Sequence, residues 1–372
     1  MRTKRRATKR RATKRRAKSR SAIKRSANRR DRGARAAHEL IVGVDGGNSK
    51  TDIILADTSG RLLAWVRVGG SNPQGIGLLP AAALLRSGID AALARAKRRG
   101  EQPAAVALCM AGIDTPRDAK AVRGALAGRG AARLANRLST RNDSEAGLRV
   151  ATSDGVGIAI VGGAGVNAIG VNEKGRTARF AALGDISGDF GGGGGLSVAA
   201  LGAAVRAREG RGPRTSLGRA ILRATRFPSL RALLDAVLEN RVPNGGIGAL
   251  GRVLLEESER GDRVAREIET LMIDHAVAFA VAAQRRAPSR RRRIPIVLIG
   301  STILSALPGY RARLYNALSD AIPNAEIRPL REPPALGALL YALDESGVGP
   351  TARARAEAAL RAAIKKAKPV KV

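Results

Sequence analysis

A short apolar run that ends in an acid and a glycine turn constrains the fold more than any other feature of this sequence. Residues 40–44 read Leu-Ile-Val-Gly-Val, with the length and branched side chains of a buried strand. The chain then turns through a Gly-Gly-Asn segment at 46–48, and residues 52–57 form a second apolar run. Backbone N–H groups exposed by glycines, with the hydroxyls of Ser49 and Thr51, are suited to a metal-bound phosphate. Gly-Gly-Asn is also good hairpin chemistry, so the loop alone leaves both interpretations open.

The same order of strand, glycine turn and strand occurs again in the second half of the chain. Residues 157–161 form an apolar strand, 162–167 a glycine-rich turn, and 168–171 and 177–180 two further strands. In the first half, the third strand is expected at 61–68. The repetition is one of architecture and not of sequence, and it predicts two related α/β units.

Helices alternate with single buried strands in the rest of the chain, as expected for parallel crossovers. Ligands gather at the C-terminal ends of such strands, so the residues that follow them are candidate site residues. The sequence predicts helices at residues 80–100, 116–128, 196–209 and 335–343, mostly helical structure over 217–285, and strands at 104–110, near Leu138 and at 294–299.

Two more glycine segments follow acids or strands. Asp185 and Asp189 precede five successive glycines at 191–195, directly before a predicted helix. A flexible linker is one interpretation, but the acids before the glycines and the helix start after them favour a close approach of the backbone to a ligand. The strand at 294–299 ends in a further glycine turn that begins at Gly300.

The net charge of +36 is concentrated at the N-terminus, where residues 1–37 hold 18 Lys and Arg against one acid and therefore carry +17. Such a block cannot bury a core, which predicts a disordered basic tail over 1–37. Non-specific contact with a polyanion and a dispensable extension are both compatible with it. Residues 346–372 are predicted to form a second basic tail.

Cysteine and hydropathy limit the class of protein. The only cysteine, Cys109, excludes an internal disulfide and a cysteine-based metal cluster within one chain, and it fits a reducing, cytoplasmic setting. No apolar run reaches the ~18 residues needed to span a membrane, so no membrane contact is expected.

In their order, these glycine turns and acids resemble those of the sugar kinase/actin/Hsp70 superfamily, and more narrowly the BadF/BadG/BcrA/BcrD ATPase family with its N-acetylglucosamine kinase branch. The resemblance covers residues 40 to about 345. It implies an α/β protein of two ribonuclease H-like (actin-like ATPase) domains with a nucleotide cleft between them. The domains would span 38–153, with the helix 333–345 packing back on it, and 154–332.

The resemblance also implies roles for individual residues. Asp143, in Asn-Asp-Ser, matches the catalytic aspartate, and Asp45 lies where Mg²⁺ would bind, through water. Asn72, Asn167 and Asp189 match substrate contacts, together with Asp143 itself. The residues that match ATP and phosphate contacts are Gly46, Gly47, Asn48, Ser49, Lys50, Thr51, Gly163, Ala164, Gly165, Gly300 and Ser301.

Several of these assignments have alternatives. Asp143 could instead cap the helix that follows it, and Asp189 is a rival base. Asp114 and Asp185 are further cleft candidates, and Lys50 could equally face solvent. Ala164 stands where the animal enzymes commonly have threonine, which removes one hydroxyl contact and leaves the sugar open among N-acetylglucosamine, glucosamine, N-acetylmuramic acid and glucose.

The implied function is an ATP- and Mg²⁺-dependent kinase that phosphorylates the 6-hydroxyl of an amino sugar, with N-acetylglucosamine as the specific expectation. A homodimer is common among such kinases. One alternative is a BadF-type ATPase without sugar kinase activity; members that drive electron transfer share an iron–sulfur cluster through two cysteines per subunit, which this chain lacks. The other is an ATPase-fold protein that binds nucleic acid through its basic tails.

Overall fold

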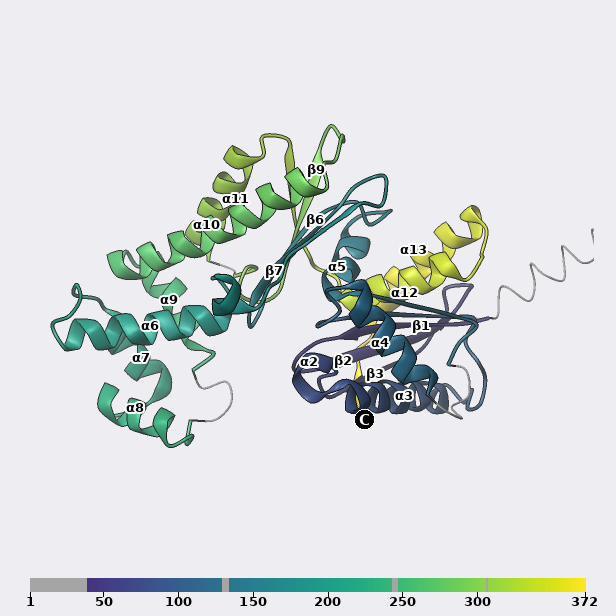
Figure 1. Ribbon diagram of the computed structural model, residues 1–372, viewed down its shortest axis with the longest axis horizontal. Coiled ribbons are helices and arrows are strands. Elements are labelled where there is room, and N and C mark those ends of the chain that lie inside the picture. Colours follow the sequence, from purple (N-terminus) through teal and green to yellow (C-terminus); the bar gives the residue numbers. More distant parts are fainter. Residues whose placement is uncertain (1–38, 129–133, 243–246, 306) are drawn as a thin grey trace, which may run out of the picture.

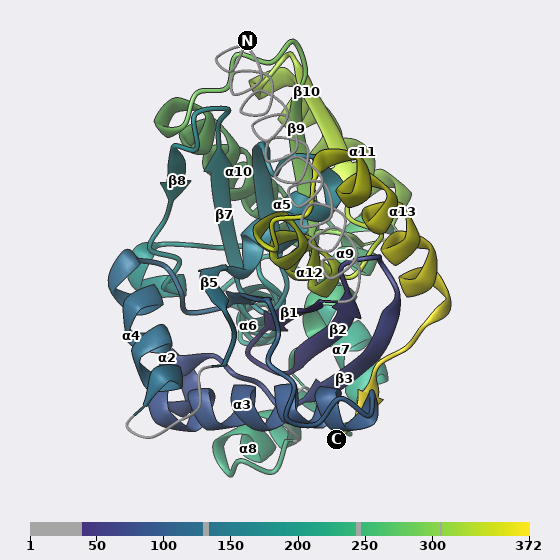
Figure 2. The ribbon, with the colours of Figure 1, turned by 90° about the vertical axis from the view of Figure 1, so that its right-hand side faces the viewer.

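A computed structural model describes residues 39–128, 134–242, 247–305 and 307–372, and it arranges them in two α/β lobes (Figure 1). The basic segment predicted to be disordered, residues 1–37, lies outside the described residues. In Figure 2 the sheet of the second lobe stands above that of the first.

The first sheet has the spatial order β11-β3-β2-β1-β4-β5. Its strands are β1 (Leu40–Gly46), β2 (Thr51–Asp57), β3 (Leu62–Val68), β4 (Ala105–Met110), β5 (Arg137–Asn142) and β11 (Val370–Lys371). β1, β2 and β3 are antiparallel neighbours, whereas β4 and β5 continue the sheet parallel to β1.

Both faces of this sheet are covered by helices, which explains why β1 is apolar on both faces. Val42 and Val44 pack in the cluster formed with α3 (Leu78–Arg95) and α4 (Pro116–Ala127). Ile41 points to the opposite face, where α12 (Pro334–Glu345) and α13 (Pro350–Lys366) pack. A short helix, α2 (Pro73–Ile76), precedes α3.

The second sheet repeats the first, with the order β10-β9-β6-β7-β8 and the same change from antiparallel to parallel neighbours. This confirms the predicted repetition of architecture. Its strands are β6 (Gly157–Gly162), β7 (Val166–Val171), β8 (Thr177–Arg179), β9 (Ile294–Ile299) and β10 (Ala325–Pro329). Its helices are the 3-10 turn η1 (Gly184–Ser187), α6 (Gly193–Arg208), α7 (Leu217–Thr225), α8 (Leu230–Leu238), α9 (Leu250–Glu259), α10 (Arg263–Arg286) and α11 (Pro308–Ala321).

Two helices connect the lobes: α5 (Asp143–Ala151) leads from the first sheet to the second, and α12 returns. Close backbone approaches hold them together. A Cβ at Gly43 of β1 would lie 2.1 Å from the Leu339 nitrogen of α12, and one at Gly337 would lie 1.8 Å from the Ala146 oxygen of α5. Only glycine fits at these contacts.

The C-terminal segment differs from the basic tail predicted for residues 346–372. It forms α13, whose Ala356, Leu360 and Ile364 are buried against the first sheet, and β11, which pairs with β3. Its apolar residues recur at helical spacing among Arg and Lys, so the charge of the segment is carried by the outward face. The strand β10 was also not predicted from the sequence, because its residues Ala-Glu-Ile-Arg-Pro include two charged side chains and a proline.

Candidate functional site

The ends of the central strands of both sheets converge on one cavity of about 300 Å³ between the lobes, here called the central cavity. Residues after β1, β4 and β5 line it from the first lobe, and the turn between β6 and β7 lines it from the second. Eight of the predicted site residues are brought together there: Asn48, Ser49, Asn72, Asp143, Gly163, Ala164, Gly165 and Asn167.

Asp143 enters the central cavity from the first turn of α5. The helix cap is its neighbour Asn142, whose side chain accepts a hydrogen bond from the Ser144 N–H at 3.0 Å and which forms a capping box with Glu145. Asn142 is therefore the N-cap, and Asp143 Oδ1 also accepts from the same Ser144 N–H, at 2.8 Å. Burial, with the charge of Asp114 as a further contribution, raises the pKa of Asp143 to about 6.

Asp45 forms the second acidic group, at the end of β1. Burial raises its pKa to about 7, and the nearby charges of Asp143 and Asp52 act in the same direction. A carboxylate whose pKa is raised by neighbouring carboxylates favours the arrival of a cation. No group of three or more acidic, histidine or cysteine side chains suited to a metal occurs in the described ranges, so a cation at Asp45 would need water or ligand oxygens to complete its shell.

The turn between β1 and β2 is closed by a hydrogen bond from Gly47 N–H to the Lys50 oxygen at 2.9 Å. Asn48 and Ser49 face the central cavity. The Thr51 hydroxyl is buried instead and donates to the Gly69 oxygen at 2.8 Å, so it fixes the turn rather than facing the cavity.

Lys50 is half exposed, and its ammonium donates to Asp52 at 2.9 Å. Asp52 is buried and also accepts two hydrogen bonds from Arg67 at 2.8 Å each. Burial opposes ionisation of Asp52, but the hydrogen bonds from Arg67 and Lys50 outweigh it and hold its pKa below the ordinary value. The ion pair with Asp52 therefore holds the half-exposed Lys50 side chain beside the turn.

Asn72 is also held from two sides. Its amide donates to the Asn48 oxygen at 2.6 Å, and its oxygen accepts from Gln74 N–H at 2.8 Å as the N-cap of α2. On the other wall, Asn167 lies at the start of β7 and lines the same cavity.

The glycine run 191–195 packs against the second turn, most closely at Gly192, where a Cβ would lie 2.3 Å from the Gly165 Cα. The Gly193 and Gly194 N–H groups donate to the oxygens of Gly163 and Ala164 at 2.7 and 3.0 Å. Gly300 has a φ of +103°, and a Cβ there would lie 2.5 Å from the Gly162 oxygen. The run is therefore a close backbone contact at the start of α6 and not a linker.

Ser301 lines a separate hollow of about 430 Å³ behind the second turn. Sequence reasoning missed its other wall, which Arg252, Leu255 and Glu256 of α9 provide. These residues lie one turn apart on an ordinary amphipathic helix, so no sequence signal distinguishes them.

Asp189 does not line the central cavity. It lies with Asp185 in an adjoining hollow of about 400 Å³ that shares the wall of Ala164, Gly165 and Val166 with the central cavity. Ser187 donates to the Asp189 carboxylate. No described Lys or Arg pairs with either acid of this hollow, which leaves it negatively charged.

A polar network surrounds Asp143, and most of its members are not among the predicted site residues. Asp114 accepts hydrogen bonds from Gln74 at 3.1 Å and from the Asn142 amide at 3.0 Å. Arg179 of β8 donates to Glu145 across the lobes. Sequence reasoning could not find this network, because its residues come from four elements that lie far apart in the sequence and meet only in the folded protein.

The comparisons with known proteins agree with this arrangement. The sequence model of the BadF/BadG/BcrA/BcrD ATPase family matches residues 42–342, which include both sheets apart from β11. The chain belongs to this family. In this chain, α13 and β11 lie beyond the region that the family model matches.

Two relatives of this BadF-family chain carry sugar kinase names. The N-acetylmuramic acid/N-acetylglucosamine kinase of Clostridium acetobutylicum is 24% identical over 307 residues, 82% of this chain and 99% of the relative. The N-acetyl-D-glucosamine kinase of Dictyostelium discoideum is 25% identical over 327 residues, 82% of this chain and 98% of the relative.

Among solved structures, a provisionally assigned N-acetylglucosamine kinase from Chromobacterium violaceum superposes with a TM-score of 0.61 at 22% identity, over 82% of this chain and 99% of that one. Another, from Porphyromonas gingivalis, has a TM-score of 0.55 at 21% identity, over 82% and 99%. Both show the shared fold.

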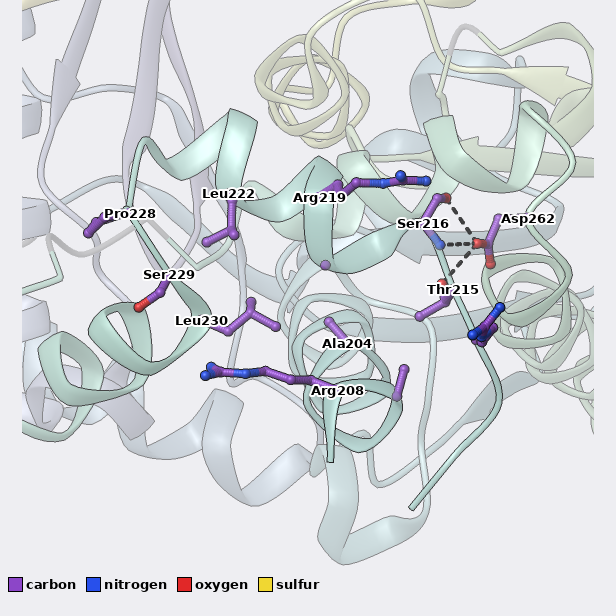
Figure 3. A pocket seen from close by; sticks show the side chains of 13 residues that line it. Ala204, Arg208, Thr215, Ser216, Arg219, Leu222, Pro228, Ser229, Leu230 and Asp262 are labelled. Atoms are coloured by element: carbon purple, nitrogen blue, oxygen red, sulfur yellow. Dashed lines mark hydrogen bonds between the residues drawn. The ribbon is translucent and has the colours of Figure 1, made fainter. Parts of the chain in front are cut away.

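Another hollow, of about 640 Å³, contains none of the predicted site residues (Figure 3). It lies within the helices of the second lobe, where Asp262 accepts hydrogen bonds from Thr215 at 2.9 Å and Ser216 N–H at 2.6 Å. This hollow is therefore separate from the central cavity, where the predicted site residues gather.

Two further findings bear on the expectations. Cys109, the only cysteine of the sequence, is buried in β4 as a free thiol. Among the helices that the structure describes, none is long and apolar enough to cross a bilayer.

Proposed function

We propose that this protein is an ATP-dependent kinase that phosphorylates the 6-hydroxyl of an amino sugar, with N-acetylglucosamine as the substrate. The observation that carries the proposal is the carboxylate of Asp143, which lies in a cavity lined by glycine turns from both lobes and raises the pKa of the nearby Asp45. Names of the Clostridium and Dictyostelium relatives support the sugar class.

In this mechanism Asp143 takes the proton from the sugar hydroxyl as that oxygen attacks the γ-phosphorus of ATP, and ADP leaves. Phosphoryl transfer depends mainly on positioning and charge neutralisation. The turns at 46–51 and 163–165 would direct N–H groups at the phosphates, and the Ser301 hollow is large enough for the adenosine. Mg²⁺, when bound near Asp45, would neutralise charge on the phosphates.

Substrate charge is a further part of the proposal. The hollow that contains Asp185 and Asp189 adjoins the central cavity, and no described basic side chain neutralises it. A 3-O-lactyl carboxylate placed there would be repelled. We therefore infer that N-acetylglucosamine is preferred to N-acetylmuramic acid.

The test is ADP release by protein lacking residues 1–37, with N-acetylglucosamine, glucosamine, N-acetylmuramic acid and glucose compared at equal concentrations. We expect stimulation by N-acetylglucosamine and a kcat/KM for N-acetylmuramic acid at least about tenfold lower. Phosphate NMR of the product should place the phosphate on C6. If none of the sugars stimulates ADP release, the kinase proposal is wrong, and sugar-independent hydrolysis would favour an ATPase.

We further infer that residues 1–37 are not needed for turnover and that the enzyme is a homodimer. The full-length and shortened proteins should have equal kcat, and light scattering should give twice the chain mass for both. Salt-dependent DNA binding that is lost on removal of 1–37 would show a polyanion contact.

A further inference from the structure

We propose that Arg179 is a positioning residue: from the second lobe, it holds the helix that carries Asp143 and the loop after β4 in register. The proposal rests on the proposed kinase function and adds to it a residue outside both glycine turns. No sequence motif marks Arg179.

The guanidinium of Arg179 joins two segments of the first lobe. Its Nη2 donates to Glu145 Oε1 at 2.6 Å, and its Nη1 donates to the Ile113 oxygen at 3.2 Å. Glu145 lies in the first turn of α5, and Ile113 lies in the loop after β4. The Arg179 side chain therefore connects the segment that follows β4 with the segment that follows β5.

The base of Arg179 is held rigidly in the second lobe. Successive side chains of a strand point to opposite faces, so Arg179 points away from its buried neighbour Ala178 and from Phe180. The Phe180 ring packs edge-on against Phe279 of α10, with centroids 5.1 Å apart. Arg179 thus projects from a strand anchored on the opposite face.

The contact with Glu145 reaches Asp143 through the helix cap. Glu145 accepts from the Asn142 N–H at 3.4 Å, and Asn142 accepts from the Ser144 N–H at 3.0 Å. The Asn142 amide also donates to the Ile113 oxygen at 3.3 Å. Asn142, which precedes Asp143, is therefore bonded to Glu145 and Ile113, and Arg179 contacts both of these directly. Ser144, which follows Asp143, is linked to them through Asn142.

Charge makes this contact more than a surface ion pair. The Glu145 side chain is only 6% exposed, and its other cation, Arg141, lies 3.6 Å away, beyond hydrogen-bond distance. Removal of Arg179 would leave a buried carboxylate with a weaker partner, and such changes cost more than an exposed pair does. The first turn of α5 is expected to move toward solvent in response.

The position of Arg179 also relates the base to the phosphate side of the cavity. Arg179 pairs with Ile169 of β7, the strand that begins directly after the turn at 163–165. The same hairpin therefore carries the second glycine turn and the arginine that contacts the cap of Asp143. Arg179 sets the spacing between the phosphate and the base, and a shift of about 1 Å at such a site costs up to about 100-fold in rate.

The test compares Arg179→Met, Arg179→Lys and the matched control Arg176→Met, in the full chain. Arg176 is an exposed residue three positions earlier, and its backbone N–H donates to the Asn172 side chain. We expect kcat of Arg179→Met with N-acetylglucosamine to fall on the order of 10- to 100-fold, while KM for ATP changes by less than about twofold. Arg179→Lys should recover part of kcat, because an ammonium can reach Glu145 but not both acceptors.

A double variant separates positioning from general loss of stability. If Arg179 acts through Glu145, Arg179→Met with Glu145→Gln should lower kcat no further than the more damaging single change. Equal kcat for Arg179→Met and wild type, or a fully multiplicative loss in the double variant, would overturn the proposal.

A readout independent of activity distinguishes this proposal from the kinase proposal. In Arg179→Met, hydrogen exchange should quicken both at 111–114 and at 142–147, with Arg176→Met unchanged. If the wild type does not phosphorylate any amino sugar, the proposed function fails while the exchange result still decides whether Arg179 holds the two segments. Unchanged exchange at both segments would reject the inference whatever the activity.

Discussion

At the scale of single residues, the environment of Asp45 and of Asp143 decides what these acids can do. Asp45 and Asp143 are both carboxylates at strand ends, and burial raises the pKa of both, to about 7 and about 6. Asp52 is also buried, but its hydrogen bonds with Arg67 and Lys50 hold its pKa below the ordinary value. Acids of one type thus divide into two with a raised pKa, which suits the proposed cation site and base, and one that is held as an anion by its cationic neighbours.

Replacement of Asp143 by asparagine tests the base directly. Asp143→Asn keeps the shape and the Asn142 cap but removes the proton acceptor, so we expect kcat to fall about 10²- to 10⁴-fold. ATP affinity measured by calorimetry should stay the same. Asp189→Asn serves as the comparison: if Asp143→Asn retains turnover and Asp189→Asn does not, the role of base belongs to Asp189.

The pH dependence of kcat/KM for the sugar provides a second test. A base must be ionised, and the pKa of Asp143 is raised to about 6, so activity should fall as pH decreases below about 6 and stay level above it. Because the pKa of Asp45 is also raised, to about 7, low Mg²⁺ should move the acidic limb toward 7. A limb near pH 4 at all Mg²⁺ concentrations would contradict these environments.

The pH dependence of the free energy of unfolding is expected to run opposite to the pH dependence of activity. Both folded-state pKa values are raised, so these acids contribute stability below their ordinary pKa and lose it as pH rises through about 6 and 7. Stability and the proposed activity are therefore expected to change in opposite directions over this pH range.

At the scale of elements, glycines without a visible motif determine how closely the connecting helices pack. Gly43 lies inside the first strand and not in its turn, yet a Cβ there would meet the backbone of α12 at 2.1 Å. The glycines of the turns and those of the helix contacts therefore serve different purposes, although both appear in the sequence as breaks in apolar runs.

A matched pair of glycine substitutions separates these roles. Gly43→Ala should destabilise the fold by about 3 kcal/mol or more, because backbone cannot move aside for the methyl group. Gly124→Ala in α4, where nothing lies within 4 Å, should stabilise by about 0.5–1 kcal/mol through helix propensity. Urea unfolding of both variants measures the difference; a neutral Gly43→Ala would mean that α12 packs less closely than described.

At the scale of the whole molecule, α5 and α12 cross between lobes and a C-terminal segment completes the first one. Arg149 of α5 is 1% exposed and donates to Asp344 at 2.9 Å and to Glu357 of α13 at 3.0 Å. The segment beyond the family match therefore contributes to the buried ion pairs of the helix that begins with Asp143.

Deletion of residues 346–372 tests this contribution. Loss of the buried Leu360 and Ile364 side chains should cost about 1.5–3 kcal/mol each, with a further loss from exposing Arg149. Thermal unfolding should show a clearly lower melting temperature, whereas deletion of residues 1–37 should leave it unchanged. A melting temperature unaffected by the C-terminal deletion would mean that the segment is a tail after all.

Much of the fold could be predicted because its signals are local. Apolar runs at 40–44 and 157–161, each followed by glycines, are short-range patterns, and their repetition predicts two sheets of the same order. β10 and the packed face of α13 could not be predicted, because charged residues on a solvent face conceal the few apolar ones that are buried. Among site residues, those in turns and strand ends were accessible to sequence reasoning, whereas Gln74, Glu145 and Arg179 were not.

The sequence by itself determined the strands, the glycine turns and the acids at their ends, since strand formation and turn chemistry depend on neighbouring residues. Only the tertiary structure decided which acids share a cavity. It places Asp143 with Asn48 and Gly163, and Asp189 in the adjoining hollow. The physical reason is that the burial of a carboxylate such as Asp143, and with it the pKa, depends on contacts between segments that lie far apart in the chain, such as those of Asn48 and Gly163.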